Sequence, residues 1–471
     1  MINESKNREQ MPMQNGPERI KNFSEVELGF SKETALKEAR RCLNCKARPC
    51  VKGCPVGVNI PDFIKKICDN DLKGAYNIIA KDNAFPAICG RVCPQEKQCE
   101  AMCVRGKLGD PVSIGRLERF VADEFMKESS KIENLDSKNK NQKENINHSK
   151  KKVAVIGSGP SGLACASELS NFGYQVTIFE ALHEVGGVLT YGIPEFRLPR
   201  NVLKYEIENL KQKGVNIATN MILGKSFSIS DLFKNGYQAV YIASGAGLPK
   251  FMNIPGEGLS GVYSANEFLT RINLMKAYRE DYDTPIVKPK NVIVIGGGNV
   301  AMDAARCAKR LGNCKVTVMY RRTEDEMPAR KAEIAHAKEE EIEFLFLSNP
   351  VKYFGSNGKV EGVEYVKMEL GSKDDSGRRV VAAITDKTYK IEADTVIVAI
   401  GNTSNPIIKN SCPEILFDEK GRIKVDPETL ETSCKSVYAG GDIVTGAATV
   451  ILAMGAGKKA AYNINKRLLE E

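Results

Sequence analysis

The chain has 471 residues, of which 42% are hydrophobic and 27% charged, and its formal net charge of +9 is spread along its length. This is too long for one compact core, so we expect roughly two to four globular domains. No apolar run approaches the ~20 residues of a membrane helix, the N-terminus lacks an apolar signal stretch, and no basic block with interleaved aromatics indicates nucleic-acid binding. The sequence therefore predicts a cytoplasmic protein without membrane or nucleic-acid partners.

The first 126 residues are rich in cysteine and carry short helical patterns. One cysteine run has the spacing C-x2-C-x4-C-x3-C-P between residues 42 and 55, and a second run lies between residues 89 and 103. Disulfides are rare in cytosolic proteins. Zinc sites often include histidine, and none of the chain's three histidines is nearby. Cysteine runs followed by proline are typical of [4Fe–4S] sites. We therefore favour a helical iron–sulfur domain over residues 1–126, with zinc and disulfides as the alternatives.

Residues 127–151 contain mainly Lys, Asn, Ser and Glu and almost no apolar residue. Such a segment cannot bury enough surface to offset the entropy lost on ordering, so it predicts a flexible linker. After it, the pattern changes to repeated strand, glycine turn and helix. This pattern predicts an α/β fold with parallel sheets and crossover helices.

A first dinucleotide fingerprint follows the strand "VAVIG". Gly157, Gly159 and Gly162 open a helix, and the next strand, "VTIFE", ends in Glu180. The glycines let the backbone approach a pyrophosphate at the helix N-terminus, and the carboxylate can accept ribose hydroxyls. We expect FAD here. The alternative is a tight turn that binds no ligand.

A second fingerprint begins in "VIVIGGGNVAMD", with Gly296, Gly298 and Ala301 at the three positions. Its second strand ends in Tyr320 instead of a carboxylate, and Arg321 and Arg322 follow. Guanidinium groups at this strand end suit a ribose that carries a 2′-phosphate. We therefore expect NADPH at the second site. The alternative for the arginines is a solvated surface pair.

Two further strands, "VYIASGA" and "TVIVAIGNT", end in small residues and would mark the chain leaving and re-entering the flavin domain. We expect FAD-binding parts at residues 152–285 and 401–471, and an NADPH-binding domain at residues 286–400. Near the C-terminus, Gly441 and Asp442 end a strand, where Asp442 could hold the flavin's ribityl hydroxyls. The helix that starts near Thr449 and Val450 could direct its dipole at the flavin ring.

This arrangement resembles the pyridine nucleotide:disulfide reductase fold, with the NADPH domain inserted into the FAD domain. No Cys-x2-Cys or Cys-x4-Cys pair occurs after residue 103, however. A catalytic disulfide is therefore missing from the sequence, and the electrons must leave by another route.

After about residue 10 the chain resembles the small subunit of NADPH-dependent glutamate synthase. The matching stretches include "RCLNC", "CGRVCPQEKQCE", "GSGPSGL", "YRRTEDEMPA" and "AGGD". The resemblance implies that NADPH reduces FAD and that electrons pass through two [4Fe–4S] clusters to a large FMN/iron–sulfur subunit, which makes glutamate from glutamine and 2-oxoglutarate. The alternative is the large subunit of the electron-bifurcating NADH-dependent ferredoxin:NADP oxidoreductase. Its partners would be a small flavin/[2Fe–2S] subunit and ferredoxin.

The same resemblance implies a set of ligands. It assigns one cluster to Cys42, Cys45, Cys50 and Cys103. It assigns the other to Cys54, Cys93, Cys99 and the carboxylate of Glu118, and leaves Cys68 and Cys89 as packing residues. All-cysteine ligation, with Glu118 in a salt bridge to a neighbouring arginine, is the alternative. The matching stretches "GGVLTYGIPEFRLP" and "GGGNVAMD", with the strand end in "AIGNT", add six cofactor-binding candidates: Gly187, Leu189, Arg197, Asn299, Val300 and Gly401.

Overall fold

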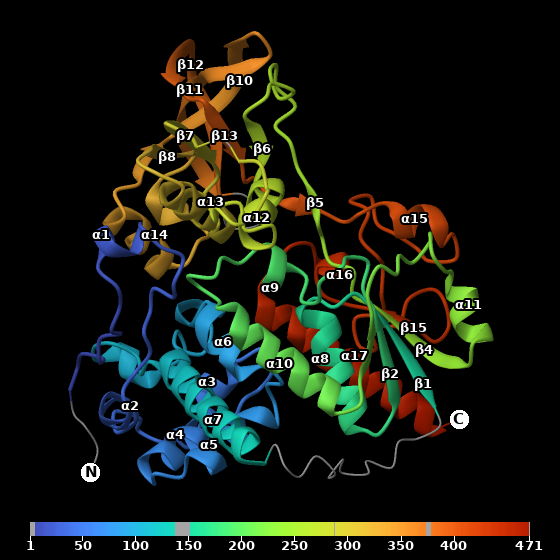
Figure 1. Cartoon of the computed structure of the whole chain (residues 1–471). Helices are drawn as coiled ribbons and strands as arrows, with labels where there is room; N and C mark the ends of the chain where they lie inside the picture. The colour runs from blue at the N-terminus through green and yellow to red at the C-terminus, as the bar shows by residue number, and fades with distance from the viewer. Residues whose placement is uncertain (1–4, 137–150, 287, 374–377, 471) are drawn as a thin grey trace.

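The computed structural model describes residues 5–136, 151–286, 288–373 and 378–470. Figure 1 shows three parts: a helical region at the N-terminal end, a first sheet unit beside it, and a second sheet unit above both. Within the described residues, no helix combines the length and apolar character needed to cross a membrane.

The helical region contains short helices joined by tight turns. In α4 (Ile60–Cys68) the residues predicted to form one apolar face, among them Phe63 and Ile64, are buried, and Pro61 stands in the first turn, where its missing N–H costs nothing. The helices are α1 (Gly16–Arg19), α2 (Lys32–Ala39), α3 (Pro49–Lys52), α4, α5 (Leu72–Ala80), α6 (Pro86–Val92) and α7 (Ile114–Asp136), with 3-10 turns at Gln95–Lys97 and Val104–Lys107.

Helix α7 extends into the segment that was expected to be a flexible linker, residues 127–151. The helix continues to Asp136, so the first ten residues of the segment expected to be flexible, 127–136, are helical. Lys and Glu have good helix propensity. A segment that contains them can therefore extend a helix that is already nucleated by its buried N-terminal turns. Most of the remaining linker, residues 137–150, lies outside the described residues.

The first sheet unit is built on five parallel strands in the order β15–β4–β1–β2–β3. The strands are β1 (Lys152–Ile156), β2 (Gln175–Phe179), β3 (Asn216–Ala218), β4 (Tyr237–Ile242) and β15 (Val437–Ala439). Helices α8 (Pro160–Asn171) and α17 (Val450–Glu470) pack closely, because a Cβ on Gly457 would lie 2.1 Å from the Ser161 carbonyl oxygen. The other helices are α9 (Val188–Tyr191), α10 (Arg200–Gln212), α11 (Ile229–Lys234), α15 (Ile407–Ser411) and α16 (Asp442–Thr445).

The second sheet unit has a parallel sheet in the order β6–β13–β7–β8–β9, and an antiparallel sheet, β10–β11–β12. Its strands are β6 (Val262–Ser264), β7 (Asn291–Ile295), β8 (Lys315–Tyr320), β9 (Glu343–Phe346), β10 (Ser348–Ser356), β11 (Lys359–Lys373), β12 (Arg379–Glu392) and β13 (Thr395–Val398). Its helices are α12 (Ala265–Asn273), α13 (Asn299–Arg310) and α14 (Lys331–Glu339). The α/β fold class with two dinucleotide-type sheets is confirmed.

The boundary expected at residues 285/286 lies too far along the chain. Strand β6 pairs with β13 of the second sheet, and Phe268 and Ile272 of α12 share a core with Val292 and Val316. The fingerprint motif marks β7, whereas β6 is a three-residue edge strand without any motif, so the sequence pattern did not reveal the earlier entry. The two connections between the units, β5 (Leu248–Pro249) and β14 (Asn402–Thr403), pair antiparallel.

Residues 11–30, called the N-terminal strap here, run from the helical region to the second sheet unit (Figure 1). Arg19 is buried and forms an ion pair of 2.8 Å with Glu340. The ring of Phe23 stacks on Tyr278 at 3.9 Å. At the other end of the strap, Glu25 pairs with Arg91 of α6 at 2.7 Å. The strap therefore ties the second sheet unit to the helical region.

Candidate functional site

The first glycine turn joins β1 to α8 and leaves open space beside its middle glycine. A Cβ on Gly157, whose φ is +102°, would lie 2.5 Å from the carbonyl oxygen of Ala243 at the end of β4. A Cβ on Gly162 would lie 1.9 Å from the Gly157 carbonyl oxygen, whereas one on Gly159 would meet nothing within 4 Å. The outer glycines permit close packing, and the middle one leaves the N-terminus of α8 accessible, as a bound pyrophosphate requires.

Glu180 and Gly187 lie beside this turn. One carboxylate oxygen of Glu180 accepts hydrogen bonds from the backbone N–H of Ser158 at 2.8 Å and from its hydroxyl at 2.5 Å. The loop before α9 comes close as well, since a Cβ on Gly187 would lie 2.9 Å from the Gly159 Cα. Leu189 in α9 is buried below the loop. The structure thus brings the predicted ribose carboxylate to the predicted pyrophosphate cradle.

The C-terminal motif reaches the same place. Gly441 packs its backbone on Ser161 of α8, and its φ of +74° favours glycine. Asp442 follows it, and burial raises the pKa of this carboxyl to about 6. Thr449 precedes α17, and its hydroxyl accepts a hydrogen bond from the Leu452 N–H at 3.4 Å. Val450, the first residue of α17, is half-buried.

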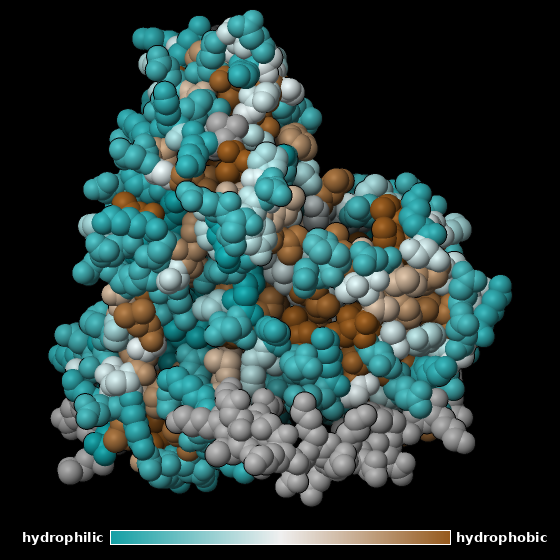
Figure 2. Space-filling model, viewed as in Figure 1, coloured by the Kyte–Doolittle hydropathy of each residue, from teal (hydrophilic) through white to brown (hydrophobic). Residues whose placement is uncertain are grey.

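Apolar surface lies around the starts of these helices. Figure 2 shows it where α8, α9 and α17 lie in Figure 1. Val188 of α9 and Leu452 of α17 are 48% and 49% exposed. A polar cradle beside apolar surface suits a flavin, whose ring is flat and largely apolar while its phosphates are charged.

The second glycine turn repeats the geometry of the first. A Cβ on Gly296, whose φ is +140°, would lie 2.3 Å from the Ala399 carbonyl oxygen at the end of β13. A Cβ on Gly298 would meet only Pro328, at 3.9 Å. Asn299 accepts a hydrogen bond from the Arg330 N–H at 2.9 Å, and Val300 is 40% exposed. This turn also offers an open helix N-terminus, here that of α13.

The two arginines at the end of β8 lie in different surroundings. Arg321 is exposed. Arg322 is buried, and its Nε donates to the Arg379 carbonyl of β12 at 2.8 Å. The side chain of Tyr320 covers the turn, because a Cβ on Gly297 would lie 2.7 Å from its ring. Arg322 therefore has a structural partner, whereas Arg321 is an accessible cation at this strand end.

Within the described part of the chain, neither Arg197 nor Gly401 forms a hydrogen bond or close contact with either glycine turn. The guanidinium of Arg197 pairs with Asp303 at 2.7 Å and with Glu333 at 3.0 Å, and both carboxylates belong to the second sheet unit. Gly401 has a φ of +102°, and a Cβ there would meet nothing within 4 Å. Arg197 is therefore paired with protein carboxylates, and its expected contact with a cofactor stays a prediction.

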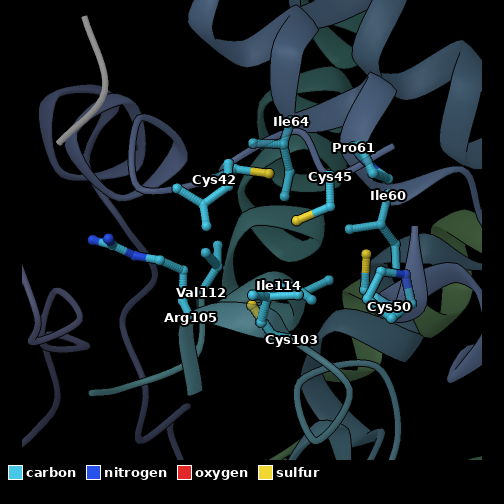
Figure 3. A pocket seen from close by; sticks show the side chains of 13 residues that line it. Cys42, Cys45, Cys50, Ile60, Pro61, Ile64, Cys103, Arg105, Val112 and Ile114 are labelled. Carbon is cyan, nitrogen blue, oxygen red and sulfur yellow. The ribbon is translucent and has the colours of Figure 1, made fainter. Parts of the chain in front are cut away.

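Four thiols face one pocket in the helical region. Figure 3 shows Cys42, Cys45, Cys50 and Cys103 around a common space whose walls include Ile60, Ile64 and Ile114. Burial raises the pKa of the Cys42 thiol to about 11, so a bound cation is needed to keep it deprotonated. Among the described residues, no three His, Cys, Asp or Glu side chains approach closely enough to hold a single ion. A pocket lined by four thiols fits an iron–sulfur cluster.

A second group of ligand candidates is more deeply buried. Burial raises the pKa of the Cys54 and Cys99 thiols, and the Glu118 carboxylate raises both further, so these groups lie near one another. A hydrogen bond with Cys89 and burial raise the pKa of Cys93, and Glu118 adds to that shift. Burial in turn raises the pKa of Glu118 to about 7. The carboxylate of Glu118 thus interacts electrostatically with each of the three thiols predicted for the second cluster.

The salt-bridge alternative for Glu118 has no support within the described part of the chain. Arg119 pairs with Glu25 at 3.0 Å and with Asp123 at 3.2 Å. Glu118 instead accepts a hydrogen bond of 2.7 Å from the Asn83 amide. Sequence reasoning missed Asn83, although it stands directly before the stretch "AFPAICGRVCP".

Comparisons with known proteins agree with this arrangement. A family model described as dihydropyrimidine dehydrogenase domain II, 4Fe-4S cluster, matches residues 19–130. A model described as pyridine nucleotide-disulphide oxidoreductase matches residues 126–220 and 151–457. The glutamate synthase (NADPH) small chain of Halomonas elongata is 33% identical over 458 residues, which cover 95% of this chain and 93% of that protein.

The chain belongs to the glutamate synthase small-chain family.

Members of this family are not alone in sharing the design. The NADP(+)-dependent formate dehydrogenase subunit beta of Moorella thermoacetica is 38% identical over 434 residues, which cover 89% of this chain but only 60% of that protein. Mycobacterium tuberculosis FprA in complex with NADPH is 21% identical, with a TM-score of 0.55 over 68% of this chain and 84% of that chain. That likeness shows the fold alone.

As a member of the glutamate synthase small-chain family, the chain is an NADPH-dependent oxidoreductase of the FAD and iron–sulfur type. The structure fits these groups: both glycine turns leave an open helix N-terminus, and four thiols line one pocket of the helical region.

Proposed function

We propose that this chain is the electron-input subunit of a glutamate synthase, which oxidises NADPH and delivers the electrons to a large partner subunit. The observation that supports it is the combination, on one chain, of two glycine turns with matching geometry and a pocket lined by four thiols. The proposed compartment is the cytoplasm, where thiols stay reduced until they bind iron.

When bound, FAD takes the hydride of NADPH and releases the electrons singly, and the clusters conduct them onward. The chain's own residues bind and orient these groups. The N-termini of α8 and α13 stabilise pyrophosphates through their N–H groups and helix dipoles, with Gly159 and Gly298 leaving the space. Glu180, which accepts a hydrogen bond from Ser158 of the first turn, can accept ribose hydroxyls, and Asp442 at the start of α16 can hold the ribityl hydroxyls. Arg321 can bind the 2′-phosphate.

We propose two cluster sites with the ligands that the family resemblance implies. The first comprises Cys42, Cys45, Cys50 and Cys103, and the second comprises Cys54, Cys93, Cys99 and Glu118. The crossing of ligands between the two cysteine runs is supported by the common pocket of the first set. We also propose revised limits for the inserted unit: the chain enters it between β5 and β6 and leaves it between β13 and β14.

The partner is proposed from the relatives, whose name as a small chain implies a larger one. A second candidate function follows from the 38% identity to the formate dehydrogenase subunit. In that case the same cofactors would exchange electrons between NADP(H) and a formate-oxidising subunit. The two candidates share the nucleotide chemistry and differ in the partner.

Gly159→Ala tests the cofactor assignment. Gly159 has a φ of −68°, and a Cβ there would touch no protein atom, so the variant should fold. The added methyl group would occupy the space proposed for the pyrophosphate. We expect FAD content to fall at least tenfold at equal protein concentration, and anaerobic NADPH to bleach correspondingly little flavin absorbance. Gly258→Ala is the matched control, because that exposed glycine also has no neighbour within 4 Å of a Cβ. Unchanged FAD content in Gly159→Ala would contradict the proposal.

The partner is tested by reconstitution. The purified chain is mixed with the glutamate synthase large subunit of the same organism, and glutamate formation from glutamine, 2-oxoglutarate and NADPH is measured. We expect activity only with both subunits present. Electron exchange with a formate-oxidising subunit, or reduction of ferredoxin, in place of glutamate formation would favour the alternatives.

A further inference from the structure

Asn83 is a buried amide that contacts both side chains competing to be the fourth ligand of the second cluster. It lies in the turn between α5 and α6 and is 1% exposed. Its Nδ2 donates to Oε1 of Glu118 at 2.7 Å. Its Oδ1 accepts from the Phe85 N–H at 3.1 Å and from the Cys89 thiol at 3.5 Å.

The amide contact leaves one oxygen of Glu118 available. Among the described residues, Oε1 is engaged by Asn83 and Oε2 has no hydrogen-bond partner. Glu118 is 9% exposed and lies near the thiols of Cys54 and Cys99. A carboxylate that is fixed through one oxygen in this way presents the other in a single direction, as ligating carboxylates commonly do.

Cys89 is held at the opposite end of the same amide. Its sulfur lies 3.5 Å from Asn83 Oδ1 and 3.5 Å from the Met454 sulfur of α17. Cys89 is 1% exposed and also adjoins Cys93, so it is close enough to the second group to compete for iron. The Cys89 sulfur is instead engaged by its contacts with Asn83 and Met454.

We propose that Asn83 is a positioning residue that selects the fourth ligand of the second cluster: its amide nitrogen orients Glu118, and its amide oxygen retains Cys89. This inference rests on the ligand set proposed above. It accounts for an eighth thiol, Cys89, beside two sites whose eight proposed ligands are seven thiols and one carboxylate. It also gives the buried amide, which forms three of its hydrogen bonds with groups around this site, a defined role.

Asn83→Asp separates the two contacts. The new carboxylate keeps an oxygen for the Phe85 N–H and for Cys89, but it has no N–H for Glu118. Loss of such a supporting contact typically weakens a metal site by about 10- to 100-fold. We expect iron to fall from about eight towards four per chain, the counts of two and one four-iron clusters, and one cluster's EPR signal to change. NADPH should still bleach the flavin. Asn77→Asp, the same substitution on the exposed side of α5, is the control and should change neither the iron content nor the EPR signal.

Asn83→Asp/Glu118→Gln reverses the direction of the hydrogen bond while keeping an oxygen at position 118. We expect it to recover most of the iron lost in Asn83→Asp, and this rescue would show that the single variant is not merely misfolded. Asn83→Ala frees both side chains, so Cys89 should occupy the vacant ligand position. Asn83→Ala should therefore retain more iron than Asn83→Ala/Cys89→Ser, with an EPR signal different from that of the unaltered protein.

The variants also separate this inference from the proposal on which it rests. Glu118→Ala should alter one cluster's EPR signal. If it does not, the ligand set itself is wrong. If Glu118→Ala alters the signal while Asn83→Asp leaves iron content and EPR unchanged, only the role of Asn83 is overturned. Equal iron in Asn83→Ala and Asn83→Ala/Cys89→Ser would show that Cys89 does not compete.

Discussion

At the scale of single residues, neighbours in the sequence have unequal roles. Arg321 and Arg322 follow the same strand, yet one is exposed and the other donates to a carbonyl of β12. The glycines of the fingerprints differ in the same way, because Gly157, Gly162 and Gly296 meet backbone atoms, whereas Gly159 faces open space and Gly298 meets only Pro328 at 3.9 Å. A motif therefore contains residues that build the turn and residues that leave room for the ligand.

We expect Arg321 and Arg322 to differ in what their replacement by alanine changes. Arg321→Ala should raise the KM for NADPH and lower the preference for NADPH over NADH at least about tenfold, because a charge-assisted contact contributes roughly 1.5–3 kcal/mol. Arg322→Ala should instead lower the thermal unfolding midpoint, since it removes a buried donor. Steady-state kinetics with both nucleotides and a thermal scan of each variant distinguish these effects. A larger loss of NADPH preference in Arg322→Ala than in Arg321→Ala would reverse the assignment.

At the scale of elements, the N-terminal strap joins parts that the fingerprints do not connect. Arg19 pairs with Glu339 and Glu340 of the second sheet unit, each at 2.8 Å, and donates to the His336 carbonyl. Arg306 and Arg310 reach the same Glu340. Glu339 is half exposed, but the other four charges are almost fully buried and depend on one another for stabilisation.

Arg19→Ala should therefore destabilise the second sheet unit. Breaking a buried ion pair costs about 3–5 kcal/mol, because the remaining charge loses its partner; here the two other arginines reduce the loss to about 3 kcal/mol. We expect a lower thermal unfolding midpoint and faster tryptic cleavage within the strap. Lys21→Ala is the control, because Lys21 and its partner Glu18 are each 68% exposed and such pairs contribute at most about 1 kcal/mol. Equal effects of the two substitutions would contradict the clamping role.

At the scale of the whole molecule, the helical region and the first sheet unit share one hydrophobic core. Phe63 and Leu117 of the helical region belong to the same buried cluster as Leu163 and Met454 of the sheet unit. The second sheet unit has cores of its own. The iron–sulfur part therefore depends on the flavin part for its packing, and the border between them is buried.

A buried carboxyl at that border predicts how stability depends on pH. Glu206 of α10 accepts a hydrogen bond from the Ala87 N–H of α6 at 3.3 Å, and burial raises its pKa to about 8. The folded protein holds this proton up to about pH 8, whereas the unfolded chain releases it near pH 4.5. Stability should therefore fall as pH rises from about 4.5 to 8 and change little from this group above that.

Glu206→Gln should remove this dependence. Relative to the unaltered protein, the variant should gain stability between pH 5 and pH 8, by at most roughly 5 kcal/mol at about 1.4 kcal/mol per pH unit. Thermal unfolding midpoints across this range measure the difference. Glu208→Gln, on the exposed side of α10, is the control. Its curve of unfolding midpoint against pH should run parallel to that of the unaltered protein. Parallel curves for Glu206→Gln would show that the carboxyl is not buried in the folded state.

The local chemistry of this protein can be predicted from its motifs. The spacing of Gly157, Gly159 and Gly162 and of the second fingerprint was enough to predict two strand–turn–helix units, because the strand, glycine and helix patterns of each unit lie within one short segment. The family resemblance added the two ligand sets, and it placed Cys103 beside Cys42 although 61 positions separate them.

The burial and the partners of side chains follow from long-range packing. Arg322 lies beneath β12, Arg197 meets carboxylates of another unit, and Asn83 bridges Glu118 and Cys89. The pairing of β6 with the second sheet could not be predicted from the sequence either, since a three-residue edge strand carries no pattern. In each case the deciding atoms come from elements remote in the chain, and long-range packing rather than local spacing sets which polar groups lose water and which partners they find.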